Sequence, residues 1–236
     1  MLQLALSIDR TPVGVARLNG TRVRKLTGIA PASVALTHWF QFDRERIERF
    51  ISATYSSAYG AVLTRHYPSF ISVHGANGNI LAAAGFRCAG YGPLFLEQYL
   101  SAPIEALVEA ATQAPIRRDS IVEIGNLAAT GSGGSLFLFV MLAAFLRRSG
   151  FTHAAVTATD SLQHTFERFH IPFQVLATAR PEMLTDGGTS WGRYFDSDPR
   201  VLLGSVAQAC TQLQVFLPDA PNTPLNSPDG EMECFA

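Results

Sequence analysis

Three closely spaced glycines, Gly131, Gly133 and Gly134, separate an apolar segment that carries one acidic residue, Glu123, from a second long apolar segment. The pattern predicts a buried strand, a tight turn and a helix that begins near residue 135. Such a helix start leaves backbone N–H groups free, and the helix dipole places positive charge at the same end. These residues therefore predict a site for a phosphate-bearing ligand, with a plain flexible turn as the alternative.

Glu123 is the candidate general base. In a regular strand its same-face neighbours, Leu127 among them, are uncharged, because side chains alternate between the two faces. A carboxyl group in such surroundings has a raised pKa, which suits a group that takes a proton from an attacking amine. A structural ion pair with Arg87 or Arg118 is the alternative.

Four other side chains are candidates for contacts with a ligand. Asn126 falls on the face opposite to Glu123 and is expected to bond either a ligand amide or a neighbouring loop. Arg87 is expected to contact an anionic group or to pair with a carboxylate such as Glu123. Trp191 and Tyr194 flank a glycine in a polar loop. We expect them either to line a substrate pocket or to cover the edge of the core.

The composition is that of a globular protein, with 236 residues, 47% hydrophobic and 16% charged. The formal net charge of −1 gives no support for a nucleic-acid partner. The three cysteines are too few and too scattered for a disulfide framework, and the histidines lack the spacing of metal ligands. The histidine spacing therefore predicts a protein without a metal. No secretory signal is recognisable at the start of the chain, so we expect a cytoplasmic protein.

The segment 124–146 contains no charge and resembles a membrane span at first sight. Its first half is rich in Gly and Ser, and its apolar part, 136–146, would be about 16 Å long as a helix, whereas a hydrocarbon core is about 30 Å thick. We therefore predict a buried helix and no membrane span.

The elements that must position these residues alternate along the chain. The patterns indicate an α/β domain in layers around one sheet, followed by an acidic, Pro-rich tail, 218–236, that we expect to be disordered. Strands are predicted at 1–8, 33–37, 70–73, 80–84, 121–128, 152–157 and 173–177, and helices at 43–59, 94–100, 104–111, 135–148 and from a cap at Asp160 onward.

Six sequence motifs between residues 50 and 201 together resemble the thermostable hemolysin family. They occur in the family's order, at 85–87, 94–100, 103–105, 122–128, 157–159 and 191–194. The layout is also similar, more distantly, to acyl-homoserine-lactone synthases and hence to the GNAT acyltransferases. This resemblance implies one GNAT-like domain over 1–217, an α/β three-layer fold with a mixed, mostly antiparallel sheet flanked by helices.

The resemblance also implies where an acyl donor binds. GNAT enzymes hold the phosphopantetheine of the donor on a glycine-containing loop after the fourth strand, and the positions of Gly131 and Gly133 fit that loop. Ala128 stands where the loop usually opens with Gln or Arg. The implied donor-binding residues are Asn126, Leu127, Ala128, Gly131, Gly133 and Gly134.

The activity implied is acyl transfer from a phosphopantetheine thioester, on acyl-CoA or acyl-carrier protein, to a small-molecule amine. Glu123 would act as the base, Tyr99 would protonate the departing thiolate, and Arg87, Trp191 and Tyr194 would bind substrate. The synthases' Arg after the Glu is missing, which argues against S-adenosylmethionine as the amine. A membrane-active cytolysin and an inactive acyl-binding module are the alternatives, and the oligomeric state is left open.

Overall fold

The computed structural model of the chain describes residues 1–27, 29, 31–131 and 133–217. Their strands are β1 (Leu2–Ile8), β2 (Thr11–Leu18), β3 (Pro31–Thr37), β4 (Ser69–Gly75), β5 (Ile80–Cys88), β6 (Ile121–Ala129), β7 (His153–Ala158), β8 (Gln174–Thr178) and β9 (Arg200–Ser205). Their α-helices are α1 (Gly20–Thr27), α2 (Arg44–Tyr59), α3 (Ile104–Thr112), α4 (Gly134–Arg148), α5 (Asp160–Arg168) and α6 (Val206–Leu213). Their short 3₁₀ helices are η1 (Ala89–Tyr91), η2 (Phe95–Tyr99), η3 (Arg118–Ser120), η4 (Pro181–Met183), η5 (Thr189–Trp191), η6 (Tyr194–Ser197) and η7 (Gln214–Phe216).

The described strands form a single sheet in the order β2-β1-β3-β4-β5-β6-β7-β9-β8. Two neighbouring pairs, β1 with β3 and β6 with β7, are parallel, and the other pairs are antiparallel. A parallel pair needs a long crossover connection, and α4 provides it between β6 and β7. The prediction of a mixed, mostly antiparallel sheet flanked by helices is confirmed.

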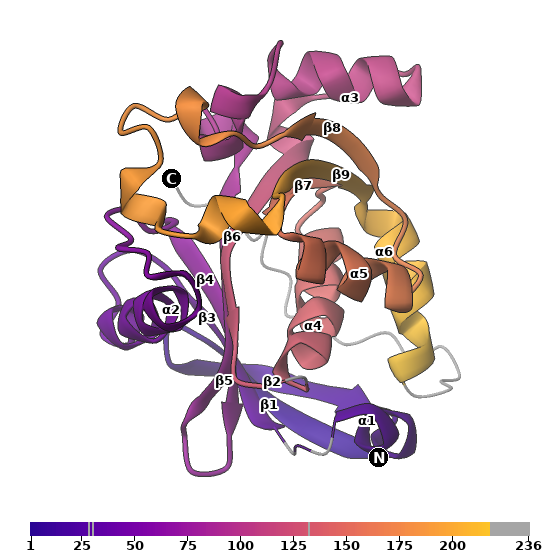
Figure 1. The fold of residues 1–236 in the computed structure, drawn as a ribbon. Helices are drawn as coiled ribbons and strands as arrows, with labels where there is room; N and C mark the ends of the chain where they lie inside the picture. The colour runs from indigo at the N-terminus through magenta and orange to yellow at the C-terminus, as the bar shows by residue number, and fades with distance from the viewer. Residues whose placement is uncertain (28, 30, 132, 218–236) are drawn as a thin grey trace.

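Helices cover both faces of the sheet (Figure 1). On one face α4 packs against β4, β5 and β6, with α5 and α6 beside it; on the other, α2 crosses the same three strands. Residues 136–143 and Leu146 of α4 are buried, which confirms the predicted buried helix. A helix that is apolar on all sides is stable only where both the sheet and other helices exclude water from it.

Helix α2 matches the predicted stripe of apolar residues. Ile47, Ile51 and Tyr55 recur every four residues, and all three side chains are buried against the sheet. The helix ends at Gly60, whose φ of 71° is a left-handed conformation that glycine adopts without strain. This helix therefore presents one defined face, with Tyr55 near its end, to the middle of the sheet.

Several elements differ from the prediction. The sequence patterns missed α1, α6, β2 and β9, because these elements are short and β2, an edge strand, is exposed along most of its length. The predicted helix 94–100 is the shorter 3₁₀ helix η2. Asp160 is wrong as the cap of α5: Thr159 holds that position, and no side chain there makes a capping hydrogen bond. The predicted tail, 218–236, lies outside the described residues.

In the part of the chain that the structure describes, every helix is too short or too polar to cross a lipid bilayer.

Candidate active site

Strand β6 is interrupted by a β-bulge at its centre. Gly85 of β5 pairs with Gly125, but Ala83 pairs with Ala128, so two residues of β6 lie opposite one residue of β5. Asn126 at the bulge has a φ of +48°, a left-handed conformation that Asn tolerates better than most residues. The bulge reverses the alternation of side chains after Gly125. Leu127 therefore packs with the α4 face, and its predicted place beside Glu123 is wrong.

Strands β6 and β7 stop pairing at the bulge. Their parallel register runs from Ile121 with His153 to Ile124 with Val156 and ends there. Beyond this point the Tyr194 hydroxyl donates to the Thr157 carbonyl oxygen at 3.3 Å. Burial raises the pKa of Tyr55, and the nearby backbone N–H of Leu127 opposes that rise.

The phenol groups of Tyr55 and Tyr194 thus bond backbone groups of β6 and β7 where the two strands diverge. The rings of Tyr55 and Tyr194 are stacked, with their centroids 6.2 Å apart, and so fill the α2 side of the opening between β6 and β7 together. At this opening the backbone groups of Leu127 and Thr157 bond phenol hydroxyls and not a neighbouring strand.

Glu123 is almost fully buried, with 1% of its surface exposed. Its carboxylate accepts the backbone N–H of Phe95 at 2.8 Å and that of Leu96 at 2.9 Å, and the Tyr67 hydroxyl is a further hydrogen-bond partner. Burial raises the pKa of Glu123, as predicted, although these hydrogen bonds and the charge of Arg87 partly oppose the rise. The carboxylate therefore anchors the start of η2 to β6.

The ring of Tyr67 explains two glycines in the strands. A Cβ atom on Gly85 would lie 2.6 Å from the Cβ of Tyr67, and one on Gly125 would overlap the Tyr67 hydroxyl. The two glycines are partners in the register of β5 and β6, so they form a slot in the sheet for this ring. Sequence analysis missed Tyr67, and the only signal for it is this pair of glycines within strand patterns.

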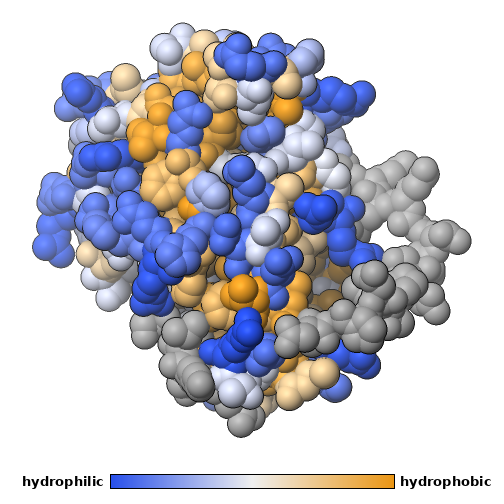
Figure 2. Space-filling view, turned by 90° about the vertical axis from the view of Figure 1, so that its right-hand side faces the viewer, coloured by the Kyte–Doolittle hydropathy of each residue, from blue (hydrophilic) through white to orange (hydrophobic). Residues whose placement is uncertain are grey.

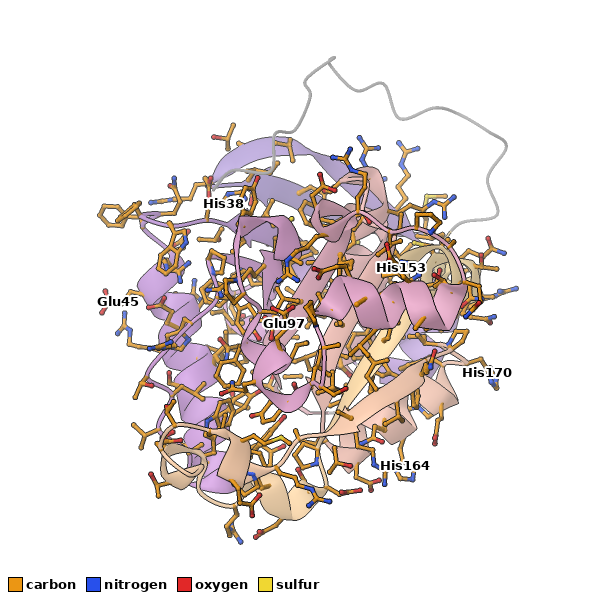
Figure 3. The ribbon with its side chains drawn as sticks, turned by 90° about the horizontal axis from the view of Figure 1, so that it is seen from above. His38, Glu45, Glu97, His153, His164 and His170 are labelled. Carbon is orange, nitrogen blue, oxygen red and sulfur yellow. The ribbon has the colours of Figure 1, made fainter. Side chains whose placement is uncertain are left out.

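Arg118 forms an ionic cluster apart from Glu123. Its guanidinium pairs with Glu97 at 2.7 Å and with Glu105, and it also donates to the carbonyl oxygens of Ala89 and Gly92. The cluster joins η1, η2, α3 and η3, and Figure 3 shows Glu97 near the centre of the view from above. The predicted alternative of a Glu123–Arg118 pair is therefore wrong.

Arg87 is the cross-strand partner of Glu123, yet its guanidinium donates to the carbonyl oxygen of Pro93, at 3.0 Å. Its charge lowers the pKa of Glu123, as noted above, and so stabilises the ionised carboxylate from a distance. Arg87 thus holds the loop before η2 close to the strand that carries Glu123.

The predicted aromatic residues lie together on the α2 side of the sheet. Trp191 has its ring centroid 5.0 Å from that of Tyr194 and 5.8 Å from that of Phe95. Tyr99 packs edge-on against Phe95 at 6.2 Å, and burial and the charge of Glu123 raise its pKa. The structure therefore brings Tyr99, Trp191 and Tyr194 into one aromatic cluster next to Glu123.

The glycine-rich turn packs on β5. Thr130 donates its backbone N–H to the Leu81 carbonyl oxygen at 2.9 Å, and a Cβ on Gly134 would lie 2.5 Å from the same oxygen. Gly131 has a φ of +69°, and Gly133 is the cap residue of α4. Close approach of α4 to β5 is therefore one reason for Gly134.

An apolar cavity with a volume of about 90 Å³ lies on the α4 face of the diverging strands. Ile124 and Leu127 of β6 and Val156 of β7 form its floor, and Phe166 of α5 and Ala209 of α6 form part of its walls. Figure 2 shows this side of the molecule, where a band of hydrophobic surface runs between hydrophilic borders. The cavity thus reaches the two strands from the face opposite to the aromatic cluster.

His153 begins β7, His164 lies on α5 and His170 follows α5 (Figure 3).

Comparison with known proteins places the chain in a family. Residues 40–210 match the family described as thermostable hemolysin. The chain belongs to the thermostable hemolysin family. The match includes all six motifs on which the sequence-based resemblance rests. No curated protein matches the chain significantly.

Solved structures resemble this thermostable hemolysin family member at low sequence identity. The acyl-homoserine-lactone synthase LasI has a TM-score of 0.54 at 11% identity, with 80% of this chain and 98% of LasI covered. TofI, solved with an inhibitor and MTA, has a TM-score of 0.50 at 13% identity, with 77% of this chain and 96% of TofI covered. At these identities the likeness shows the fold, and the predicted GNAT-like fold is confirmed.

Proposed function

We propose that this protein is an N-acyltransferase that moves an acyl group from a phosphopantetheine thioester to an amine. The observation that carries this proposal is the opening between β6 and β7 at the bulge, which lies above the apolar cavity. Backbone groups of Leu127 and Thr157 at the opening would bind the amide groups and the carbonyl of a pantetheine arm in place of the Tyr55 and Tyr194 hydroxyls. The fold shared with an acyl-homoserine-lactone synthase supports the same reaction class.

The acyl chain would pass between the strands into the cavity, whose lining is apolar apart from Ser205. The phosphates of acyl-CoA or of acyl-carrier protein would lie at the glycine-rich turn, Gly131 to Gly134, at the start of α4. Asn126, Leu127 and Ala128 would line the path between these two ends.

The reaction would proceed by direct attack. The amine nitrogen bonds to the thioester carbonyl carbon, the C–S bond breaks, and the thiolate leaves with the electron pair of that bond. The carbonyl oxygen would replace the Tyr55 hydroxyl as the acceptor of the Leu127 backbone N–H, which would stabilise it. Tyr99, whose phenol is protonated at neutral pH, would protonate the thiolate.

Glu123 would receive the proton that the amine loses. Because two backbone N–H groups already bind its carboxylate, the route we propose is through the Tyr67 hydroxyl. Tyr67 takes the amine proton on its oxygen and passes its own proton to Glu123, whose raised pKa favours the transfer. Arg87, Trp191 and Tyr194 would border the substrates.

The direct experiment is to incubate the full chain with acyl-CoA or acyl-carrier protein and a panel of primary amines, and to follow free thiol and the N-acyl product by mass spectrometry. We expect product with at least one amine, and a loss of about 10²-fold or more in kcat for Glu123→Gln. Absence of donor binding and of thiol release would overturn the proposal. Donor binding that is identical in Glu123→Gln, without turnover in either protein, would favour the inactive acyl-binding module.

The burial of α4 argues against the alternative of a cytolysin. Membrane lysis needs an apolar segment that reaches the lipid, whereas residues 136–143 are enclosed between the sheet and its neighbouring helices. Leakage from liposomes treated with the purified protein would favour the cytolysin instead.

A further inference from the structure

The hydroxyl of Ser205 borders the apolar cavity far from the opening between β6 and β7. Among the described residues that line this cavity, Ser205 carries the one polar side chain. Ser205 is the register partner of His153 at the start of β7, whereas the pairing of β6 with β7 ends at Val156. Because each strand residue advances the chain by about 3.3 Å, Ser205 lies about 10 Å from the opening. Its hydroxyl also accepts the backbone N–H of Gln208, at 3.4 Å.

The carbonyl oxygen of Pro172, another lining residue, is also remote from the opening. It lies 3.4 Å from the place that a Cβ on Gly204 would take. Gly204 pairs with Ala154, two residues before Val156 on β7, so this oxygen is at the level of the deeper part of the cavity. A polar group on a bound chain could therefore find these two partners only well inside the cavity.

The lining next to the opening consists of apolar side chains. Val156 and its register partner Leu202 on β9 are buried, and they pack with Ile124 of β6 and Phe166 of α5. Both strand pairs, β6 with β7 and β7 with β9, continue through Val156, so its backbone groups face neighbouring strands. Leu127, the first residue after the bulge, completes this end of the lining. A chain that enters at the opening is therefore surrounded first by hydrocarbon side chains.

The carbon atoms next to the thioester would lie at this end of the cavity. In the proposed function the thioester carbonyl binds the backbone N–H of Leu127, and the third carbon of the acyl chain follows the carbonyl carbon after two C–C bonds, within about 3 Å. An oxygen on that carbon would lose its bonds to water and gain no polar side chain in exchange. The Ser205 hydroxyl, about three strand residues away, is too distant to compensate.

We propose that this cavity selects acyl donors with an unsubstituted aliphatic chain over donors with a hydroxyl or keto oxygen on the third carbon, and that Val156 is a specificity-determining residue. This inference rests on the proposed function and names the class of its acyl donor. Val156 has this role because it lines the cavity and is the last residue of β7 that pairs with β6, where the chain would enter.

The kinetic test compares hexanoyl and 3-hydroxyhexanoyl thioesters of the same carrier, with the full chain and an amine that it accepts. We expect kcat/KM to be about 10- to 10²-fold higher for the hexanoyl donor. Val156→Thr keeps nearly the same shape and adds a hydroxyl beside the third carbon, so this ratio should fall by about tenfold. Ala154→Ser is the matched control, since it adds a hydroxyl deeper in the cavity, on the same strand, and should keep the wild-type ratio.

Binding without turnover separates this inference from the proposed function. Calorimetry measures Kd for the S-hexyl and S-(3-hydroxyhexyl) thioethers of CoA, which cannot transfer an acyl group. We expect the S-hexyl compound to bind about tenfold or more tightly in the wild type, and this difference to shrink in Val156→Thr. If that pattern holds and no amine is acylated, the selective cavity stands and the proposed reaction fails.

The inference is overturned, and the proposed function survives, if the wild type transfers hexanoyl and 3-hydroxyhexanoyl groups with kcat/KM values within about twofold. It is also overturned if Val156→Thr keeps the wild-type ratio, or if Ala154→Ser lowers the ratio as much as Val156→Thr does. If neither thioether binds and no donor reacts, the inference and the proposed function fail together. Melting temperatures of both variants show whether a changed ratio comes from a folded protein.

Discussion

Gly85 and Gly125 face each other across β5 and β6, and the ring of Tyr67 occupies the space that their side chains would need. The two glycines therefore leave room for the Tyr67 hydroxyl to bond a buried carboxylate. That carboxylate is Glu123, which lies two residues before Gly125 on the same strand. The first two predictions follow from this arrangement.

Alanine at Gly125 should displace Tyr67 and destabilise the protein. The added Cβ overlaps the phenol, and overpacking of a core costs about 1–3 kcal/mol. Urea unfolding of Gly125→Ala should show a lower midpoint, and Gly85→Ala should behave in the same way. Gly204→Ala is the matched control, because its Cβ meets only the Pro172 carbonyl oxygen, at 3.4 Å. Equal midpoints for Gly125→Ala and Gly204→Ala would contradict the slot.

Phenylalanine at position 67 should keep the ring in its slot but remove a hydrogen-bond donor from Glu123. The pKa of Glu123, already raised by burial, should rise further, because the ionised form loses a partner. Stability should fall by about 1–3 kcal/mol where Glu123 is ionised in the wild type, and by less at low pH, where it is protonated. Urea unfolding over a series from neutral to acidic pH checks this, with Tyr59→Phe as the control. A loss independent of pH would contradict it.

Glu97 should make the protein sensitive to acid. Burial raises the pKa of its carboxyl, but hydrogen bonds from Arg118 and from the backbone of Ile104 and Leu94 lower it more, to about 2. Since this pKa is below the ordinary value of 4.5 for a glutamate carboxyl, the stabilisation is complete above about pH 4.5 and is lost as the pH falls toward 2. Melting temperatures of Glu97→Gln and wild type should differ at pH 7 and converge near pH 2.

The exposed Glu45 provides the control for this pH dependence. Its ion pair with Arg49 lies in solvent, so Glu45→Gln should change stability by less than about 0.5 kcal/mol at any pH. A constant difference between Glu97→Gln and wild type from pH 7 to pH 2 would show that Glu97 acts without its charge.

The apolar cavity should set the length of the acyl chain. Leucine at Ala209 on α6 projects additional methyl groups into the cavity, so the longest accepted donors should lose about tenfold or more in kcat/KM while short donors lose little. A series of acyl-CoA substrates of increasing chain length checks this. Ala207→Leu, an exposed position on the same helix, is the control. Unchanged selectivity for acyl-chain length in Ala209→Leu would show that the acyl chain does not bind in this cavity.

The periodicity of apolar residues predicted the elements that pack on both sides of the sheet centre, such as α2 and α4. In both helices the buried residues are those that the apolar pattern predicts, because α2 buries one apolar face and α4 is enclosed on all sides. The edge strand β2 was missed, because water on its outer side removes the pattern.

The candidate site was predicted in part. Glu123 and its raised pKa could be inferred from its apolar neighbours, and the resemblance identified Tyr99, Trp191 and Tyr194, which the structure brings close to Glu123. The bulge at Asn126 could not be inferred from the sequence, because strand patterns assume unbroken alternation of side chains. The loop that carries His66 and Tyr67 is distant in sequence from β6, so its contacts leave no signal in the β6 sequence other than Gly125.

The ionic cluster at Arg118 bears on motion as well as on acid stability. One guanidinium holds carbonyl oxygens of η1 and the turn after it together with carboxylates of η2 and α3, so none of these segments can open without breaking its bonds. Their amide hydrogens should therefore exchange with solvent as one cooperative unit. The wall that faces Glu123 would then behave as one rigid unit.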